Sequence, residues 1–224
     1  MREYFDLAAE GHTVAYDREA PFELRIQDPN SGPQEVGTLE AIRVKILQLV
    51  SKLSLTQMKG EPNGLQNVKI ELTSENDLFF HYTHIVDEDS FRHMQENQKL
   101  MIEFGDYTNI LIKMVNSCIK EPHSFLAVFI MNRDGSAKLD FIQNIEYKFI
   151  ELLSCDFIAS PEDTVRQSIT FRYNSVKSKV ALMEARLKDV NNLVKVKNPS
   201  LLLQLQKQNP QMQSSMHQSK SKGF

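Results

Sequence analysis

The feature that most constrains the fold of this chain is a run of apolar residues near its C-terminal end, spaced alternately four and three residues apart. This spacing is the heptad repeat of a coiled coil, whose helices pack along a continuous apolar seam. Valine at two of the a positions, Val180 and Val194, favours two parallel helices. A single amphipathic helix docked on its own domain would need the same apolar face, so both alternatives stay open here. The coiled-coil seam consists of Ile169, Tyr173, Val176, Val180, Met183, Leu187, Val190 and Val194.

The start of this helix is marked by Ser160-Pro161-Glu162-Asp163. Serine is a good N-cap, proline suits the first helical position, and acidic residues interact favourably with the N-terminal end of the helix dipole. We therefore predict an exit helix and short parallel coiled coil over residues 161–198. The Gln- and Ser-rich composition that follows predicts a disordered tail over 199–224.

Charge is distributed unevenly along the chain. Residues 190–224 contain five lysines and no acidic residue, and because the net charge is −3, residues 1–189 carry −8. The acidic part is a poor candidate for nucleic-acid binding. The basic tail suits weak contact with acidic surfaces such as tubulin, although a solubilising end would have the same composition.

Residues 41–160 are rich in β-branched and aromatic segments with period-two alternation, which predicts strands. Two helices are expected between them, one capped by Asp87 and one carrying the apolar face Leu111 to Ile119. We expect a strand over 99–104 between these helices. Asp134-Gly135 indicates a hairpin turn. Residues 1–40 suggest short strands interrupted by turn signals and are predicted to form an N-terminal extension to a β-rich head over 41–160.

Signals of chemistry are weak. His81 and His84 are three residues apart in a predicted strand, so their side chains point to opposite faces and cannot share a metal. Cys118 and Cys155 lie in apolar patterns without a CxxC pair, as reduced structural thiols do. No phosphate-binding loop or hydrolase motif is present, and no apolar run suits a signal peptide or membrane span. We expect no enzyme activity, no cofactor and no metal.

Residues 68–118 resemble the signature region of the spindle assembly abnormal protein 6 family, the centriolar cartwheel proteins. The resemblance rests on an ordered set of residues. Its members are Leu72-Thr73, Asp77, Phe79-Phe80-x-Tyr82, Asp87 to Phe91, Gln98-x-Leu100 and Phe104.

The resemblance implies a mainly β fold with short helices (α+β), in which a β-sandwich or barrel head leads into a parallel coiled coil. It also implies a head-to-head contact, in which an apolar side chain at a hairpin tip enters a pocket of the neighbouring head. Here the tip is expected at Tyr147, or at Ile145 or Phe149, which we expect on the same strand face. The pocket is expected around Phe80, Phe91 and Met94. Tyr147 as an ordinary cross-strand aromatic is the alternative.

The resemblance further implies a self-associating structural protein of the cytoplasm and cytoskeleton, at the centriole or basal body. Because the predicted coil is short, the chain is similar to the form that lacks the long spoke, which is associated with flagellar bases and apical structures. The alternative is a head-plus-coil scaffold of the DNA end-joining type, which would bind DNA through the basic tail. We expect the partners to be further copies of the chain, and centriolar or tubulin-associated proteins at the tail.

Overall fold

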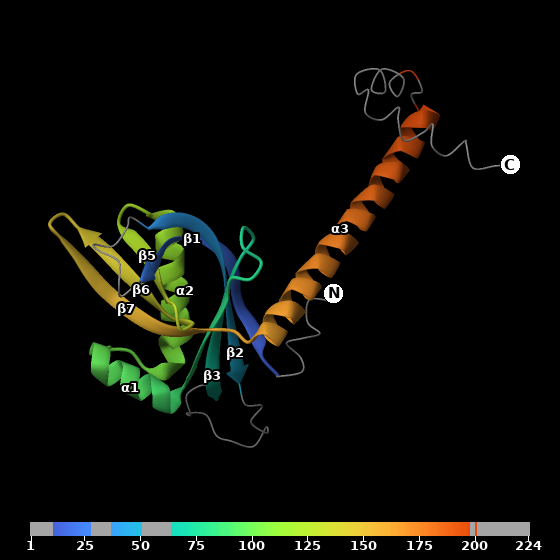
Figure 1. The fold of residues 1–224 in the computed structure, drawn as a ribbon. Coiled ribbons are helices and arrows are strands. Elements are labelled where there is room, and N and C mark those ends of the chain that lie inside the picture. The colour runs from blue at the N-terminus through green and yellow to red at the C-terminus, as the bar shows by residue number, and fades with distance from the viewer. Residues whose placement is uncertain (1–10, 28–36, 51–63, 198–199, 201–224) are drawn as a thin grey trace, which may run out of the picture. The chain divides into compact units, whose positions relative to one another are not determined.

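The computed structural model describes residues 11–27, 37–50, 64–197 and 200, and Figure 1 shows the arrangement of its elements. The contacts divide the chain into two units, Met1–Val165 and Arg166–Phe224, which are described here separately. In the first unit seven strands form a closed barrel in the order β1-β2-β3-β4-β7-β6-β5. Neighbouring strands are antiparallel except β1 and β5, whose parallel pairing closes the barrel. The strands are β1 (Thr13–Gln27), β2 (Thr38–Val50), β3 (Leu65–Ser74), β4 (His81–Asp87), β5 (Phe125–Asn132), β6 (Ser136–Ile145) and β7 (Lys148–Ala159).

The prediction of a mainly β head is confirmed, but its N-terminal boundary was wrong. Residues 13–27 of the expected extension form β1, and the expected boundary at residue 40 lies inside β2. The turn signals around Pro21 obscured an alternation that places Ala20, Phe22 and Leu24 in the core. Pro21 is accommodated because the parallel pairing with β5 begins one residue later, at Phe22. Residues 1–10 and 28–36 lie outside the described residues.

Two helices interrupt the strand order, α1 (Glu88–Gln98) and α2 (Phe104–Lys120). The prediction that Asp87 caps α1 is confirmed, since Ser90 donates its backbone N–H to Asp87 Oδ1 over 2.9 Å. Pairing the Asp87 N–H with Ser90 Oγ, at 3.0 Å, completes a capping box. Helix α2 packs against β1 and β5 (Figure 1).

The strand predicted over 99–104 was wrong. Lys99 adopts a left-handed conformation with φ of 53° and ends α1, and α2 begins five residues later at Phe104. Leu100, Ile102 and Phe104 all pack against the core, which explains the alternation of apolar and polar residues. The segment that carries this alternation connects two helices and is not a strand. The connector has no neighbouring strand; the Ile102 carbonyl accepts a hydrogen bond from the Gln95 side chain at 2.7 Å.

The barrel is incomplete along the contact between β4 and β7, where only Tyr82 and Thr83 of β4 pair with β7. Side chains satisfy the rest of this edge. Gln98 donates to the Ser154 carbonyl at 2.7 Å and accepts from the Ser154 N–H at 2.9 Å, as a strand neighbour would. His84 Nδ1 bonds the carbonyl of Asp156. These contacts meet the requirement that buried backbone groups find partners.

The second unit contains the rest of α3 (Glu162–Lys197), a helix of 36 residues. The predicted start after Ser160-Pro161 agrees with this boundary, and the Val165 N–H bonds the Pro161 carbonyl at 3.1 Å. Val165 is the one fully buried residue in the described part of α3. Among the described residues, no helix is both long and apolar enough to cross a membrane.

Candidate self-association surfaces

The hairpin between β6 and β7 carries the residue predicted to mediate the head contact. Its turn consists of Glu146 and Tyr147 alone, and the hairpin, yellow in Figure 1, projects beyond the neighbouring strands. Tyr147 is 94% exposed, and Ile145 and Phe149 beside it are also exposed. Such side chains at a strand end gain nothing from the core of their own barrel, so the cross-strand aromatic alternative does not describe Tyr147.

The three tip residues had been expected to share one strand face, but they do not. Ile145 pairs with Lys148, whereas Phe149 pairs with Asn144. Since directly paired residues point to the same side and successive residues alternate, Ile145 and Phe149 lie on opposite faces of the hairpin. The two-residue turn causes this. It pairs Ile145 with Lys148, so Phe149 is one residue further along the strand and its side chain points to the other face. Tyr147, in the turn itself, is the most exposed of the three.

The residues expected to form the receiving pocket belong mainly to the core and do not line one cavity together. Phe80 is 7% exposed and its ring packs on Tyr82 and Phe129, with centroids 5.0 and 5.6 Å away. Phe91 is 2% exposed and packs on Phe104 and Tyr107. Met94 is partly buried against the same core. Phe91 does reach a different cavity with polar walls, between Leu65, Arg92, Gln95 and Glu103.

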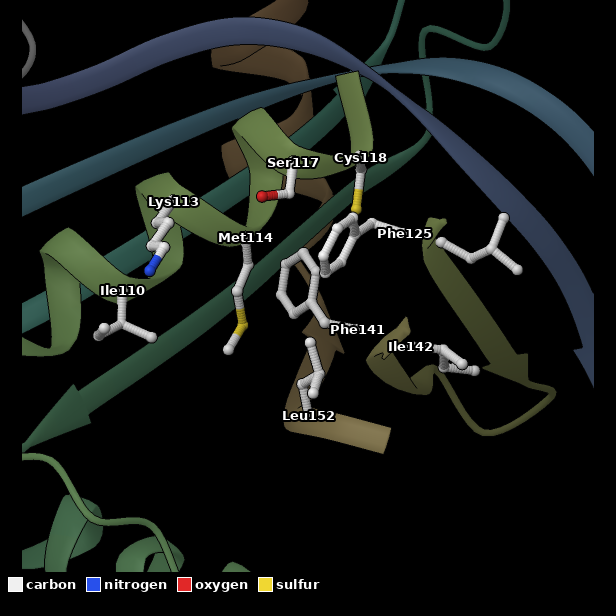
Figure 2. A pocket seen from close by; sticks show the side chains of 10 residues that line it. Ile110, Lys113, Met114, Ser117, Cys118, Phe125, Phe141, Ile142 and Leu152 are labelled. Carbon is white, nitrogen blue, oxygen red and sulfur yellow. The ribbon is translucent and has the colours of Figure 1, made fainter. Parts of the chain in front are cut away.

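An apolar cavity of about 250 Å³, missed by the sequence reading, lies between α2 and strands β5, β6 and β7. Figure 2 shows Met114 of α2 and the rings of Phe125 and Phe141 pointing into it. Leu152, on the bulge where β6 and β7 shift register, forms part of its wall. The available signal was a second apolar row on α2, at Ile110 and Met114, beside the predicted core face. The full lining is Ile110, Lys113, Met114, Ser117, Cys118, Phe125, Leu126, Phe141, Ile142 and Leu152.

The predicted coiled-coil seam lies along α3 and is uncovered within this chain. Six of its eight members, from Tyr173 to Val190, are between 48% and 65% exposed, and Ile169 and Val194 are half-buried. A regular apolar stripe with this exposure is a candidate interaction surface.

His81, His84 and Cys155 of the head have structural partners. His84 Nε2 lies 3.1 Å from the Tyr107 hydroxyl, which lies 3.5 Å from Cys155 Sγ. Because the Asp156 carbonyl must accept from Nδ1, a neutral His84 accepts at Nε2, and burial lowers its pKa. His81 Nδ1 bonds Ser160 Oγ at 2.8 Å, away from the His84 network.

The thiols are unsuited to nucleophilic chemistry. Burial raises the pKa of the Cys118 thiol to about 11 and that of Cys155 to about 12, so both stay protonated near neutral pH. The two cysteines are buried and unpaired with each other. Over the described ranges, no group of three or more His, Cys, Asp or Glu side chains is placed to hold a metal ion.

Comparison with solved structures finds the same fold in N-terminal fragments of SAS-6 proteins. A Leishmania SAS-6 fragment containing parts of its coiled coil domain matches with a TM-score of 0.64 at 15% identity, over 86% of this chain and 99% of that chain. A Drosophila melanogaster Sas-6 fragment dimerised via the coiled-coil domain matches with a TM-score of 0.64 at 13% identity, over 97% of both chains. A C. elegans SAS-6 N-terminal coiled-coil dimer matches with a TM-score of 0.60 at 10% identity, over 80% of this chain and 98% of that chain.

Similar curated proteins are much longer than the region they share with this chain. The spindle assembly abnormal protein 6 homolog of Danio rerio is 21% identical over 140 residues, which are 59% of this chain and 22% of that protein. The homolog of Gallus gallus is 20% identical over 157 residues, 66% of this chain and 24% of that protein. The chain thus spans about a quarter of the length of these relatives.

The family comparison covers most of the barrel. Residues 14–157 match the family described as centriolar protein SAS N-terminal domain, from the first strand of the barrel to the last. This range includes the β6–β7 hairpin and the whole lining of the apolar cavity, and it amounts to more than half of the chain. The chain therefore belongs to the centriolar SAS N-terminal domain family.

Proposed function

We propose that this chain is a self-assembling structural protein of the centriole, basal body or a related cytoskeletal structure. The observation that carries the proposal is the pair of uncovered apolar surfaces, one at the Tyr147 hairpin tip and one along α3, in a chain of the SAS family. Exposed apolar surface of this kind marks interaction sites. With two separate self-association surfaces, each copy contacts two others, so assembly continues beyond a dimer.

The α3 surface is proposed to form a parallel two-stranded coiled coil. Val180 and Val194 are β-branched, which suits the a positions of a two-stranded coil. A parallel partner brings Lys179 of one helix near Glu184 of the other, although Arg172 would then face Lys177. These charges give little net support, so most of the association energy must come from burying the seam itself.

The hairpin tip is proposed to enter the apolar cavity of a second head. The cavity wall includes Ile142 and Leu152, each about four or five residues from the turn. At about 3.3 Å per residue, the tip stands roughly 15 Å from the cavity of its own head and cannot bend back into it. In a two-fold pairing of heads, each tip can enter the cavity of the other head, and Ile142 and Leu152 of the cavity wall lie on the same hairpin as the tip.

The size of the cavity is compatible with this occupant. An apolar cavity of about 150 Å³ can bind benzene, so about 250 Å³ leaves room for a phenol ring. This cavity replaces the pocket expected at Phe80, Phe91 and Met94. Those side chains already pack in the core, so they could not admit a ring without exposing the core.

The proposed cellular setting rests on the family description, centriolar protein SAS N-terminal domain. We propose the same setting here, with further copies of the chain as the main partner. The basic tail proposed to contact centriolar or tubulin-associated proteins lies, except for Ser200, outside the described residues.

The test is sedimentation velocity of the full chain over a concentration series, with two variants. Tyr147→Glu places a charge at the tip, and Val180→Asp with Leu187→Asp places charges in the seam. We expect the unmodified chain to grow beyond a dimer, each variant to stop at a dimer, and their combination to be a monomer. An unmodified chain that stops at a dimer, or a Tyr147→Glu variant that grows like the unmodified chain, would contradict the hairpin contact.

A further inference from the structure

The apolar cavity has two polar side chains on its α2 wall. Lys113 and Ser117 lie four residues apart, which is one turn of the helix, and therefore share a face. Figure 2 shows both beside Met114, with the Ser117 hydroxyl and the Lys113 ammonium at the edge of the lining. Neither side chain makes a hydrogen bond or ion pair with any of the described residues. Ser117 is half-buried, so its hydroxyl already has restricted access to water.

The tip residue that would enter the cavity is also polar at its end. Tyr147 carries a phenol hydroxyl that has no protein partner within the described residues of its own head. Burying such a hydroxyl without a partner costs about 1–3 kcal/mol. A phenylalanine would fill the same space without this cost. Tyrosine at the tip is therefore favourable only if the receiving cavity supplies a polar partner for its hydroxyl.

We infer that the Tyr147 hydroxyl of one copy is held by Lys113 and Ser117 of the next. The hydroxyl donates to Ser117 Oγ and accepts from Lys113 Nζ, which uses its single proton and one lone pair. The ring then lies against Met114, Phe125 and Phe141, where sulfur–aromatic and aromatic contacts are favourable. This inference rests on the hairpin contact proposed above and identifies what makes that contact specific.

The consequence is selectivity between tips. A cavity with two unpaired polar groups discriminates against a tip without a hydroxyl. Such a tip would cover these groups but could not form hydrogen bonds with them. Heads of this chain should thus prefer a tyrosine tip to a phenylalanine tip. A purely apolar cavity would show the opposite preference.

The test measures the head contact alone, in the full chain carrying Val180→Asp and Leu187→Asp. Sedimentation equilibrium gives its dissociation constant for Tyr147→Phe, Ser117→Ala, Lys113→Met and their double combinations. We expect Tyr147→Phe and Ser117→Ala each to weaken the contact about 5- to 20-fold, and Lys113→Met to weaken it less because Lys113 is exposed. The combination of Tyr147→Phe with Ser117→Ala should be no weaker than the worse single variant.

Two outcomes would overturn the inference: a Tyr147→Phe contact as tight as the starting one, or single effects that simply add. The matched control is Lys120→Met, which removes a charge from the same helix outside the cavity lining and should leave the dissociation constant unchanged. Tyr147→Glu separates the two proposals. If it abolishes the contact while Tyr147→Phe does not weaken it, the hairpin contact stands and only the role of Lys113 and Ser117 fails. If no head association is detected in the full chain carrying Val180→Asp and Leu187→Asp, both proposals fail.

Discussion

The barrel and α3 use the same kinds of apolar residue in regular patterns, yet they bury them to very different extents. Phe22, Phe129 and Phe157 of the barrel are at most 1% exposed, whereas Val180 and Leu187 of the helix are about half exposed. In the barrel, strands from distant parts of the chain supply the opposing surface. In α3 the apolar stripe is still exposed. The difference teaches that a regular apolar pattern requires a partner surface but does not say which molecule provides it.

The two turns at the ends of β6 differ in a similar way. The turn after β5 has Asp134, whose carboxylate accepts from the Ser136 N–H at 2.9 Å, and Gly135 with φ of 85°. Its polar groups are satisfied locally. The turn before β7 instead presents Tyr147 to solvent. One turn only connects strands, whereas the other offers a surface that a neighbouring molecule can cover.

The sharpest test of this comparison is to remove one large side chain from each region. Phe129→Ala should lower the free energy of unfolding of the barrel by about 3–5 kcal/mol, because Phe129 packs on Phe80, Tyr82 and Phe157 and leaves a cavity. Leu187→Ala on α3 should leave barrel unfolding unchanged. Urea titration followed by near-UV circular dichroism of the buried tyrosines measures both, since the chain has no Trp. Equal losses for the two variants would refute the contrast.

Acid should affect the barrel through His84. Its pKa is lowered in the folded barrel, mainly by burial, so the unfolded chain binds the proton more readily. Stability contributed by neutral His84 is present above the unfolded pKa of about 6.5 and is lost as pH falls from there towards the folded pKa, by at most about 1.4 kcal/mol per pH unit.

Urea unfolding between pH 5 and 7.5 measures this dependence. His84→Gln should be less stable at neutral pH but should flatten the dependence, while His93→Gln, on the exposed side of α1, should leave it as it was. An unchanged slope in His84→Gln would assign the dependence to other groups.

The smallest expected effects concern two glycines of the barrel unit. Gly135→Ala should destabilise the barrel by about 1–2 kcal/mol, because a positive φ is unfavourable for alanine. Gly105→Ala should stabilise it by about 0.5–1 kcal/mol, since a Cβ there meets nothing within 4 Å and alanine favours the helix. Thermal unfolding of the two variants beside the unmodified chain is sufficient. A stabilising Gly135→Ala would show that the turn does not hold this conformation.

Much of the fold was readable because its signals are local. The Asp87 cap, the Asp134-Gly135 turn, the start of α3 and most strands depend on residues close together in sequence. The errors have non-local causes. The alternation in 99–104 serves a connector, because the β7 edge beyond its short pairing with β4 is bonded by the side chains of Gln98 and His84. The strand β1 was expected only as short pieces outside the head, because its place in the barrel depends on the pairing with β5, which joins residues about 100 positions apart.

The same division applies to the candidate surfaces. The heptad stripe of α3 is a local pattern that the sequence shows directly, whereas Tyr147 was expected at the tip because of the resemblance to the SAS family. It did not reveal the cavity between α2, β5, β6 and β7, whose wall depends on the bulge at Leu152 and on how four elements meet. Phe80 and Phe91 were chosen for their apolar character, which core and pocket residues share.

By itself, the sequence determined a mainly β head and an exit helix with a heptad stripe, because periodicity and turn chemistry act over a few residues. Only the tertiary structure decided that β1 closes the barrel in parallel with β5, that His84 and Gln98 satisfy the β7 edge, and that Lys113 and Ser117 border an apolar cavity. These features depend on distances between residues far apart in the chain, which no local pattern encodes.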